Sequence, residues 1–282
     1  MIAGGVAAGV FGSLLGLGGG VLIVPLLTLG FGLPLREAVG VSLVSVIVTS
    51  SASAGVYLQR HVANLRLGMT LELFTALGAL AGGLVAFMVT DRVLAGLFAL
   101  LLVYVAVSML RRREPAPAPA VQPHPVQADQ GPAADAHLPA VAASGWPSER
   151  TIDRLSGPGY RVRGLRRGVI GAVVAGLVSA LLGVGGGIIK VPLMNLMMGV
   201  PLRVATATSN LMIGVTASSS AVIYLLRGGI DPYVAGPTAV GVYLGASLGS
   251  RIAHRVNTRV LRSLFVVVLL YNAIQMALRA LR

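Results

Sequence analysis

Seven stretches of this chain are apolar over roughly the 20 residues that an α-helix needs to span a bilayer. They are 38–58, 68–90, 93–110, 168–189, 205–226, 233–252 and 260–278. Only 11% of the 282 residues are charged, against about 25% in a soluble globular protein, and the mean hydropathy is +0.85. The pattern predicts an all-α polytopic membrane protein.

The same unit occurs twice in the chain, at an offset of 167 residues and without a gap. "LLGLGGGVLIVPLLTLGFGLPLREA" matches "LLGVGGGIIKVPLMNLMMGVPLRVA", and "VTSSASAGVYLQR" matches "VTASSSAVIYLLR". The matched pairs are 14–38 with 181–205 and 48–60 with 215–227. About 40% of the aligned positions from 14 to 108 are identical. We therefore predict two homologous transmembrane repeats, 1–110 and 168–282, each of about four hydrophobic segments.

Residues 111–167 separate the two repeats and differ from them in composition. Pro, Ala, Gln and Gly dominate the first half of this segment, which is typical of a flexible linker. Arginines flank the linker on both sides, and cytoplasmic loops of membrane proteins collect arginine and lysine. We predict a cytoplasmic linker without chemistry of its own, in a multi-pass protein of the cell inner (plasma) membrane.

The charges and residue types of the chain argue against several classes of function. The net charge of +13 is carried mainly by arginines at segment ends and in the linker, so we predict no nucleic-acid partner. A metal exporter would need several carboxylate or imidazole ligands in the membrane. The chain offers too few of them: Glu72 within a segment, and His61 and His254 near segment ends. Without cysteine, and without a visible nucleophile–base pair, we predict no enzyme, no metal and no cofactor.

Glycines interrupt the first segment of each repeat, at 16–20 and 183–187, and Pro25 or Pro192 follows. Glycine in a helix interior costs about 1 kcal/mol relative to alanine, so these runs should break the helix. In lipid, freed backbone groups must face protein or a water-filled cavity, and a helix N-terminus can bind an anion. We predict that the breaks line a substrate cavity, the alternative being that they only allow close helix packing. The predicted substrate-binding glycines are Gly18, Gly19, Gly20, Gly185, Gly186 and Gly187.

The sequence is compatible with two membrane topologies. If the broken segment crosses the membrane, each repeat has four crossings and the repeats are parallel. If it dips in and returns, each repeat has three crossings and the second repeat is inverted. Arginines after the linker slightly favour inversion, whereas Arg60 and Arg66 of the first repeat fit the parallel arrangement. Eight segments is the working count.

The second segment of each repeat opens after "PLR" and carries a row of hydroxyls. Ser42 and Thr49 in one copy, and Ser209 and Thr216 in the other, are seven residues apart and share a helix face. Hydroxyls in membrane helices can simply bond to the backbone or join helices, which is how we interpret the neighbouring serine runs. The predicted polar substrate ligands are Ser42, Thr49, Asn195, Thr208, Ser209, Asn210 and Thr216.

Lys190 is the only lysine of the chain, and its aligned partner is Ile23. A lysine deep in a bilayer costs at least about 2.5–3.5 kcal/mol and indicates function, unless it lies near an interface and snorkels to water. None of the nine acidic residues is an obvious partner, and Glu72 alone lies within a segment. We predict that Lys190 is an unpaired cation whose missing charge a substrate anion supplies. Glu72 could serve as a proton carrier if transport is coupled.

These motifs resemble those of the TauE/SafE sulfite exporter family of membrane permeases. The resemblance rests on "GLGGGVLIVPLL" and "GVGGGIIKVPLM", each followed by P-L-R-x-A and a Ser/Thr cluster, and it covers both repeats. The first cluster, "VGVSL", departs from the pattern because a threonine would be more typical there. The resemblance implies export of a small sulfur-containing anion, sulfite or a sulfonate such as sulfoacetate.

Anion export is physically compatible with a simple carrier. With a negative cell interior, each outward-moving negative charge gains about 2.3 kcal/mol per 100 mV, so a uniporter needs no coupling ion. We expect alternating access between the two repeats, with the small anion and the lipid bilayer as partners and a homodimer as an assembly to test. The alternatives are an anion channel and a non-transporting membrane assembly protein.

Overall fold

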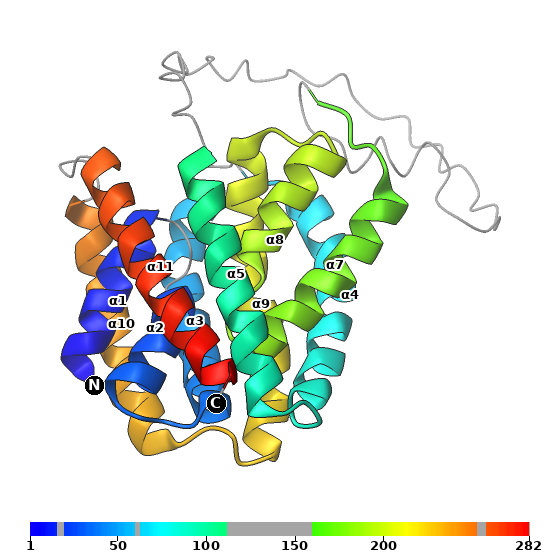
Figure 1. The fold of residues 1–282 in the computed structure, drawn as a ribbon. Coiled ribbons are helices and arrows are strands. Elements are labelled where there is room, and N and C mark those ends of the chain that lie inside the picture. Colours follow the sequence, from blue (N-terminus) through cyan, green and yellow to red (C-terminus); the bar gives the residue numbers. More distant parts are fainter. Residues whose placement is uncertain (16–19, 60–62, 112–159, 253–257, 282) are drawn as a thin grey trace, which may run out of the picture.

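The computed structural model describes residues 1–15, 20–59, 63–111, 160–252 and 258–281 (Figure 1). The described chain is helical and contains no strand, which confirms the all-α prediction. Its α-helices are α1 (Ile2–Leu15), α2 (Gly20–Pro25), α3 (Leu35–Gln59), α4 (Leu65–Ala86), α5 (Asp91–Arg111), α7 (Leu165–Leu182), α8 (Gly187–Pro192), α9 (Leu202–Leu226), α10 (Pro232–Ile252) and α11 (Thr258–Leu281). Two π-helical turns, η1 (Leu26–Gly30) and η2 (Leu193–Met197), continue α2 and α8.

Four of the described helices are long and apolar enough to cross a membrane. They are Leu65–Ala86, Asp91–Leu110, Leu165–Leu182 and Val204–Leu226, which belong to α4, α5, α7 and α9. These helices support a membrane protein. Most of the predicted linker, 112–159, lies outside the described residues, and α7 begins at Leu165, slightly before the predicted start of the second repeat.

The break between α7 and α8 falls in the glycine run. Gly183, Gly185 and Gly186 have φ angles of 67°, 77° and 75°. Side chains with a Cβ rarely adopt this left-handed region, whereas glycine populates it freely. The Gly183 N–H donates to the carbonyl of Ser179 at 2.8 Å and closes the end of α7. The chain then turns back into α8.

The segment formed by α7, α8 and η2 returns to the end of the bundle from which it starts. A Cβ placed on Gly171 would meet the side chain of Leu193, and one on Gly168 would meet Met198, so the start of α7 lies beside η2 and the residue that follows it. The Arg163 N–H also donates to the Met198 carbonyl at 3.0 Å. The first segment of this half is therefore a helical hairpin formed by α7, α8 and η2. A similar hairpin is formed at the N-terminus by α1, α2 and η1, where a Cβ on Gly4 would meet Leu26 (Figure 1). We call these the second and the first hairpin.

Helices related by the 167-residue offset run in opposite directions. α4 lies parallel to α7, since Gly78 approaches Val173 and Gly82 approaches Leu177 in turn. α1 lies parallel to α10 in the same manner. Because α4 runs opposite to α1 in Figure 1, α7 does so as well. The helix directions are therefore those that the inverted arrangement predicts.

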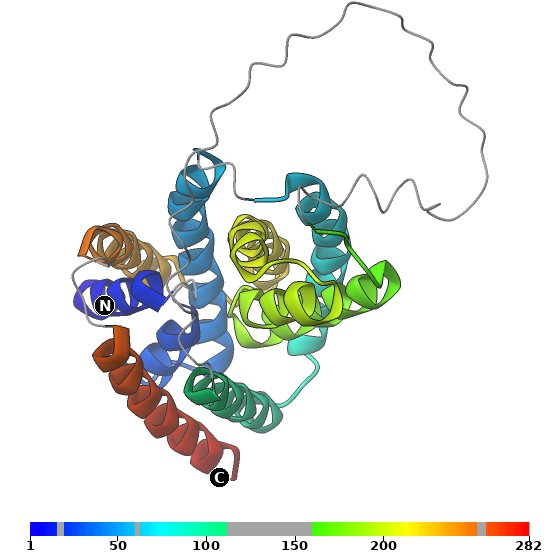
Figure 2. The ribbon, with the colours of Figure 1, turned by 90° about the horizontal axis from the view of Figure 1, so that it is seen from above.

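The helices form two bundles that each contain one helix from the other half of the chain. α4 packs on α7 and α9, and α8 packs on α9; we call α4, α7, α8 and α9 the second bundle. α10 packs on α1 and α3, and α2 packs on α3; we call α1, α2, α3 and α10 the first bundle. The bundles meet through α3 and α9 at the centre, while α5 pairs with α11 at one side (Figure 2).

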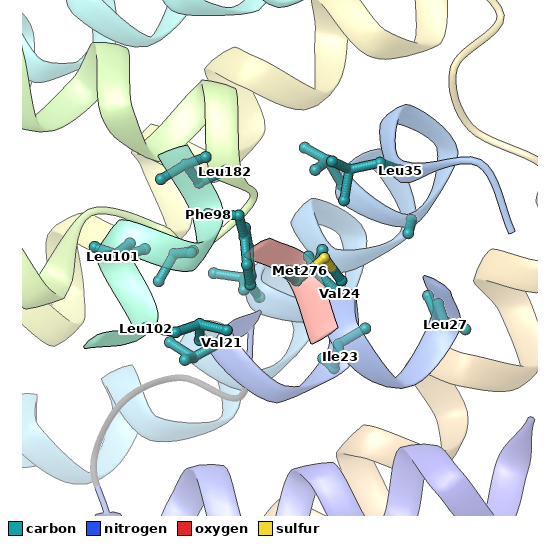
Figure 3. Close-up of a cluster of buried hydrophobic side chains, with 14 of the residues drawn as sticks. Val21, Ile23, Val24, Leu27, Leu35, Phe98, Leu101, Leu102, Leu182 and Met276 are labelled. Carbon is teal, nitrogen blue, oxygen red and sulfur yellow. The ribbon is translucent and has the colours of Figure 1, made fainter. Parts of the chain in front are cut away.

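A buried apolar cluster lies where α2 meets α5 and α11 (Figure 3). Ile23 of α2, Phe98 of α5 and Met276 of α11 are each at most 1% exposed. Burial of such a side chain stabilises the fold by about 1.5–3 kcal/mol. Ile23, the residue aligned with Lys190, is thus part of a hydrocarbon core.

Candidate functional site

Lys190 forms a buried ion pair with Glu72. The Lys190 Nζ lies 2.9 Å from the Glu72 Oε2, and the two residues are 1% and 7% exposed. Lys190 lies on α8, and Glu72 lies about two turns into α4. The prediction of an unpaired cation is therefore wrong, because α4 crosses from the first half of the chain into the second bundle and carries its carboxylate to α8.

Thr216 of α9 joins the ion pair. Its Oγ1 donates to the Glu72 Oε1 at 2.6 Å and accepts from the Lys190 Nζ. Three helices of the second bundle thereby meet in one polar cluster. A buried ion pair is weak evidence for stability, because desolvation offsets much of the attraction. Ionisable side chains inside a membrane are instead typical of functional sites.

Two buried serine hydroxyls beside this cluster have no hydrogen-bond partner among the residues that the structure describes. Ser179 and Ser209 are each 1% exposed. A Cβ placed on Gly186 would lie 3.3 Å from the Ser179 Cβ and 3.4 Å from the Lys190 Cε, and one on Gly187 would lie 3.5 Å from the Ser209 Oγ. The two serines therefore lie at the turn that starts α8, one helical turn before Lys190 in the chain.

Ser209 is one of the predicted ligands, whereas sequence reasoning missed Ser179. Ser179 is the only hydroxyl-bearing residue of α7. A single polar residue in an otherwise apolar helix could have indicated a functional position. However, a lone serine in such a helix usually hydrogen-bonds to its own backbone. Only the packing of α7 against α8 shows that this serine is buried beside Gly186, without a hydrogen-bond partner in the described part of the chain.

Ser42 connects the two bundles instead of joining the polar cluster. Its Oγ donates to the Gly183 carbonyl at 2.7 Å, and the Gly20 carbonyl lies at 3.3 Å. One hydroxyl of α3 thus contacts the ends of both breaks, at the first residue of α2 and at the residue that caps α7. This contact places Ser42 between the two hairpins.

We expect Ser42→Ala to lower the free energy of unfolding by about 1 kcal/mol, because the Gly183 carbonyl would lose its buried donor. The thermal unfolding midpoint of the purified protein in detergent measures this change. Ser45→Ala is the matched control, since the Ser45 Oγ donates only one turn back within α3, to the Val41 carbonyl at 3.0 Å. Equal shifts in the two variants would show that the contact between the bundles contributes nothing.

Three other predicted ligands hydrogen-bond elsewhere. The Thr49 Oγ1 lies 3.1 Å from two carbonyl oxygens of its own helix. The Asn195 Nδ2 donates to the Val200 carbonyl at 2.9 Å, and the Thr208 Oγ1 accepts from the Asn64 N–H at 2.9 Å. The structure does not bring these side chains into the cluster around Lys190.

The remaining predicted positions divide between the two breaks. Gly185 to Gly187 form the turn beside Lys190, and Gly20 begins α2. Gly18 and Gly19 lie outside the described residues. The Asn210 carbonyl accepts from the Ser50 Oγ at 2.8 Å, which is a second contact between α3 and α9.

The charged cluster has no counterpart at the aligned positions of the other half. The residues 167 positions from Glu72 and Lys190 are Ala239 and Ile23, while Thr216 aligns with Thr49. The two breaks therefore differ in chemistry: Ile23 lies in an apolar cluster, whereas Lys190 lies in a polar cluster with Glu72 of α4 and Thr216 of α9.

Comparison with known proteins gives a consistent assignment. A family model described as sulfite exporter TauE/SafE matches residues 1–276. The chain is 24% identical over 279 residues to the probable membrane transporter protein YunE of Bacillus subtilis (strain 168), covering 96% of this chain and 94% of YunE. It is 27% identical over 287 residues to the probable membrane transporter protein MamO of Magnetospirillum gryphiswaldense, covering 96% of this chain and 43% of MamO. No solved structure matches the chain.

Proposed function

This chain belongs to the TauE/SafE sulfite exporter family of membrane transporters, and on that basis we propose that it exports a small sulfur-containing anion. Sulfite and sulfonates such as sulfoacetate are the substrates that we propose. The observation that carries the proposal is the polar cluster at the break between α7 and α8. There, Lys190 and two buried hydroxyls that have no partner among the described residues lie inside an apolar protein. A small oxyanion requires a positive charge and several hydrogen-bond donors.

Lys190 can bind an anion while it remains paired with Glu72. An ammonium group has three N–H donors, and Glu72 and Thr216 accept from two of them. The third has no acceptor within the described part of the chain. Glu72 would then hold the lysine side chain in position at the break.

If the anion binds to the ion-paired Lys190, the only net charge that moves across the membrane is that of the substrate. Lys190 and Glu72 cancel each other, so the loaded carrier has the charge of the anion. Outward movement then gains about 2.3 kcal/mol per charge per 100 mV, which is enough to drive export without a coupling ion. Proton transfer by Glu72 is the alternative, and it would appear as proton movement together with the anion.

Alternating access would arise from rocking of the first bundle against the second. The bundles meet along α3 and α9, and two hydrogen bonds connect them: the Ser42 Oγ donates to the Gly183 carbonyl, and the Ser50 Oγ donates to the Asn210 carbonyl. Each bundle contains one helix from the other half of the sequence, since α4 belongs to the second bundle and α10 to the first. The moving units in this proposal are therefore the bundles and not the two halves of the sequence. Inverted repeats are a recurring basis for this kind of motion in transporters.

We further propose that the linker faces the cytoplasm and that the protein lies in the cell inner membrane. In the inverted arrangement, the end of α5 and the start of α7 then lie on the cytoplasmic side, as the arginines around the linker require. A homodimer is a further proposal, which the mass of the protein in detergent would test.

We expect saturable export of sulfite or sulfoacetate from proteoliposomes, accelerated by an imposed potential that is negative inside. Initial rates measured against internal concentration, with taurine and sulfate alongside, test this directly. Protein-free liposomes are the control. A rate that rises linearly without saturation would favour the channel, and no flux of any of these anions would contradict the proposed substrate class.

A further inference from the structure

Ser179 and Ser209 differ from the other hydroxyls of the neighbouring helix. On α9, the hydroxyls of Ser218, Ser219 and Ser220 donate one turn back within the helix, at 2.8, 3.0 and 3.1 Å. This local bond is the ordinary way in which a serine is satisfied in a membrane helix. Ser179 and Ser209 make no such bond, and both are 99% buried.

A buried hydroxyl without a partner is unfavourable, and in a bilayer water does not relieve it. Such groups are rare in folded proteins, and each requires an explanation. In the described structure, the buried side-chain polar atoms without a partner are these two hydroxyls and the Arg36 Nε. Two of the three therefore lie beside the same glycine turn.

The two hydroxyls approach this turn from different helices. Ser179 lies in the last turn of α7 against Gly186, and Ser209 lies on α9 against Gly187. The Lys190 Cε is also in reach of Gly186. Because Gly186 and Gly187 have no side chain, the backbone of the turn lies close to Ser179, to Ser209 and to the Lys190 side chain.

We propose that Ser179 and Ser209 bind oxygen atoms of the transported anion, while Lys190 supplies the opposing charge. This inference rests on the proposed function and names the residues that select the substrate. A sulfite or sulfonate group presents three oxygens in a pyramid. Three donors from three helices, α7, α8 and α9, match that group one to one, whereas a carboxylate presents only two oxygens.

The test compares Ser179→Ala and Ser209→Ala with Ser220→Ala, a buried serine of α9 whose hydroxyl is satisfied within its own helix. The Michaelis constant for sulfite and for sulfoacetate is measured in proteoliposomes, and the unfolding midpoint is measured in detergent. We expect each of the first two variants to raise the Michaelis constant about tenfold or more, as loss of a hydrogen bond to a charged group does. Ser220→Ala should leave it unchanged.

Stability separates a binding role from a structural role. Removing an unsatisfied buried hydroxyl should leave the unfolding midpoint unchanged or raise it, whereas removing a structural hydrogen bond lowers it. The inference would be overturned if Ser179→Ala and Ser209→Ala had the same Michaelis constant as the wild-type protein. It would also be overturned if the unfolding midpoints of these two variants lay below that of Ser220→Ala.

Failure of the proposed function gives a different result. Stabilisation of the detergent-solubilised protein by sulfite or sulfoacetate is measured independently of transport. If the wild-type protein is stabilised by the anion, and the two alanine variants are not, the binding residues are supported even where no flux occurs. If the wild-type protein transports the anion and all three variants resemble it, the proposed function stands and the inference is wrong.

Discussion

Lys190→Met should destabilise the protein by about 3–5 kcal/mol and abolish anion flux. The variant would leave the Glu72 carboxylate buried without its cation, which is the costly way to break a buried ion pair. The loss of flux has a separate cause, since the anion would lose its opposing charge. Thermal unfolding in detergent and flux in proteoliposomes measure the two effects independently.

The double variant Glu72→Gln/Lys190→Met separates stability from transport. With neither charge present, the desolvation cost disappears, and replacing a buried pair by neutral groups is often without net cost. We expect the unfolding midpoint to recover towards that of the wild type while flux remains absent. Recovery of both would show that Lys190 only balances Glu72. Glu37→Gln, at the start of α3, controls for the loss of a carboxylate elsewhere.

Gly176→Ala is expected to have the second largest effect, a destabilisation of about 3 kcal/mol. A Cβ on Gly176 would collide with the carbonyl oxygen of Thr75 and approach the backbone nitrogen of Ala79. These are backbone atoms of α4, so the clash is relieved only if α4 and α7 move apart. Because α4 holds Glu72, that movement would also disturb the ion pair. The unfolding midpoint and the flux measure the two consequences.

Gly96→Ala is the matched control for this substitution. Gly96 also lies in a helix, α5, but the nearest atom to a Cβ there would be the Ala280 Cβ at 3.7 Å, which is an ordinary van der Waals contact. Alanine is favoured over glycine in a helix interior by up to about 1 kcal/mol, so this variant should be neutral or more stable. A similar loss of stability in both variants would contradict the close packing of α4 on α7.

Features that depend on neighbouring residues could be predicted from the sequence. Apolar runs of bilayer length predicted the membrane helices, since each helix satisfies its own backbone groups and needs only apolar side chains. The helix break at Gly183–Gly186 was also predictable, because it too depends on residues that are neighbours in the sequence. Glycine weakens a helix locally, and the observed left-handed φ angles are ones that glycine adopts readily. The sequence also singled out Lys190, because a charge in lipid is costly.

The direction of the second half was not predictable in this way. The arginines near the segment ends supported both arrangements, because each places some of them on the cytoplasmic side. The return of the hairpin depends on α7 packing against η2, with Gly171 beside Leu193. That contact is between side chains and backbone of separate elements, and no local pattern encodes it.

The sequence by itself determined that this protein is a helical membrane protein, where its hairpin breaks, and that one lysine is unusual. Only the tertiary structure decided what that lysine contacts. Glu72 lies 118 residues away along the chain and reaches Lys190 because α4 packs in the second bundle. Ser179 likewise became a candidate only through its place beside Gly186. Hydropathy and helix breaking are properties of neighbouring residues, whereas a binding site is formed by side chains that only folding brings together.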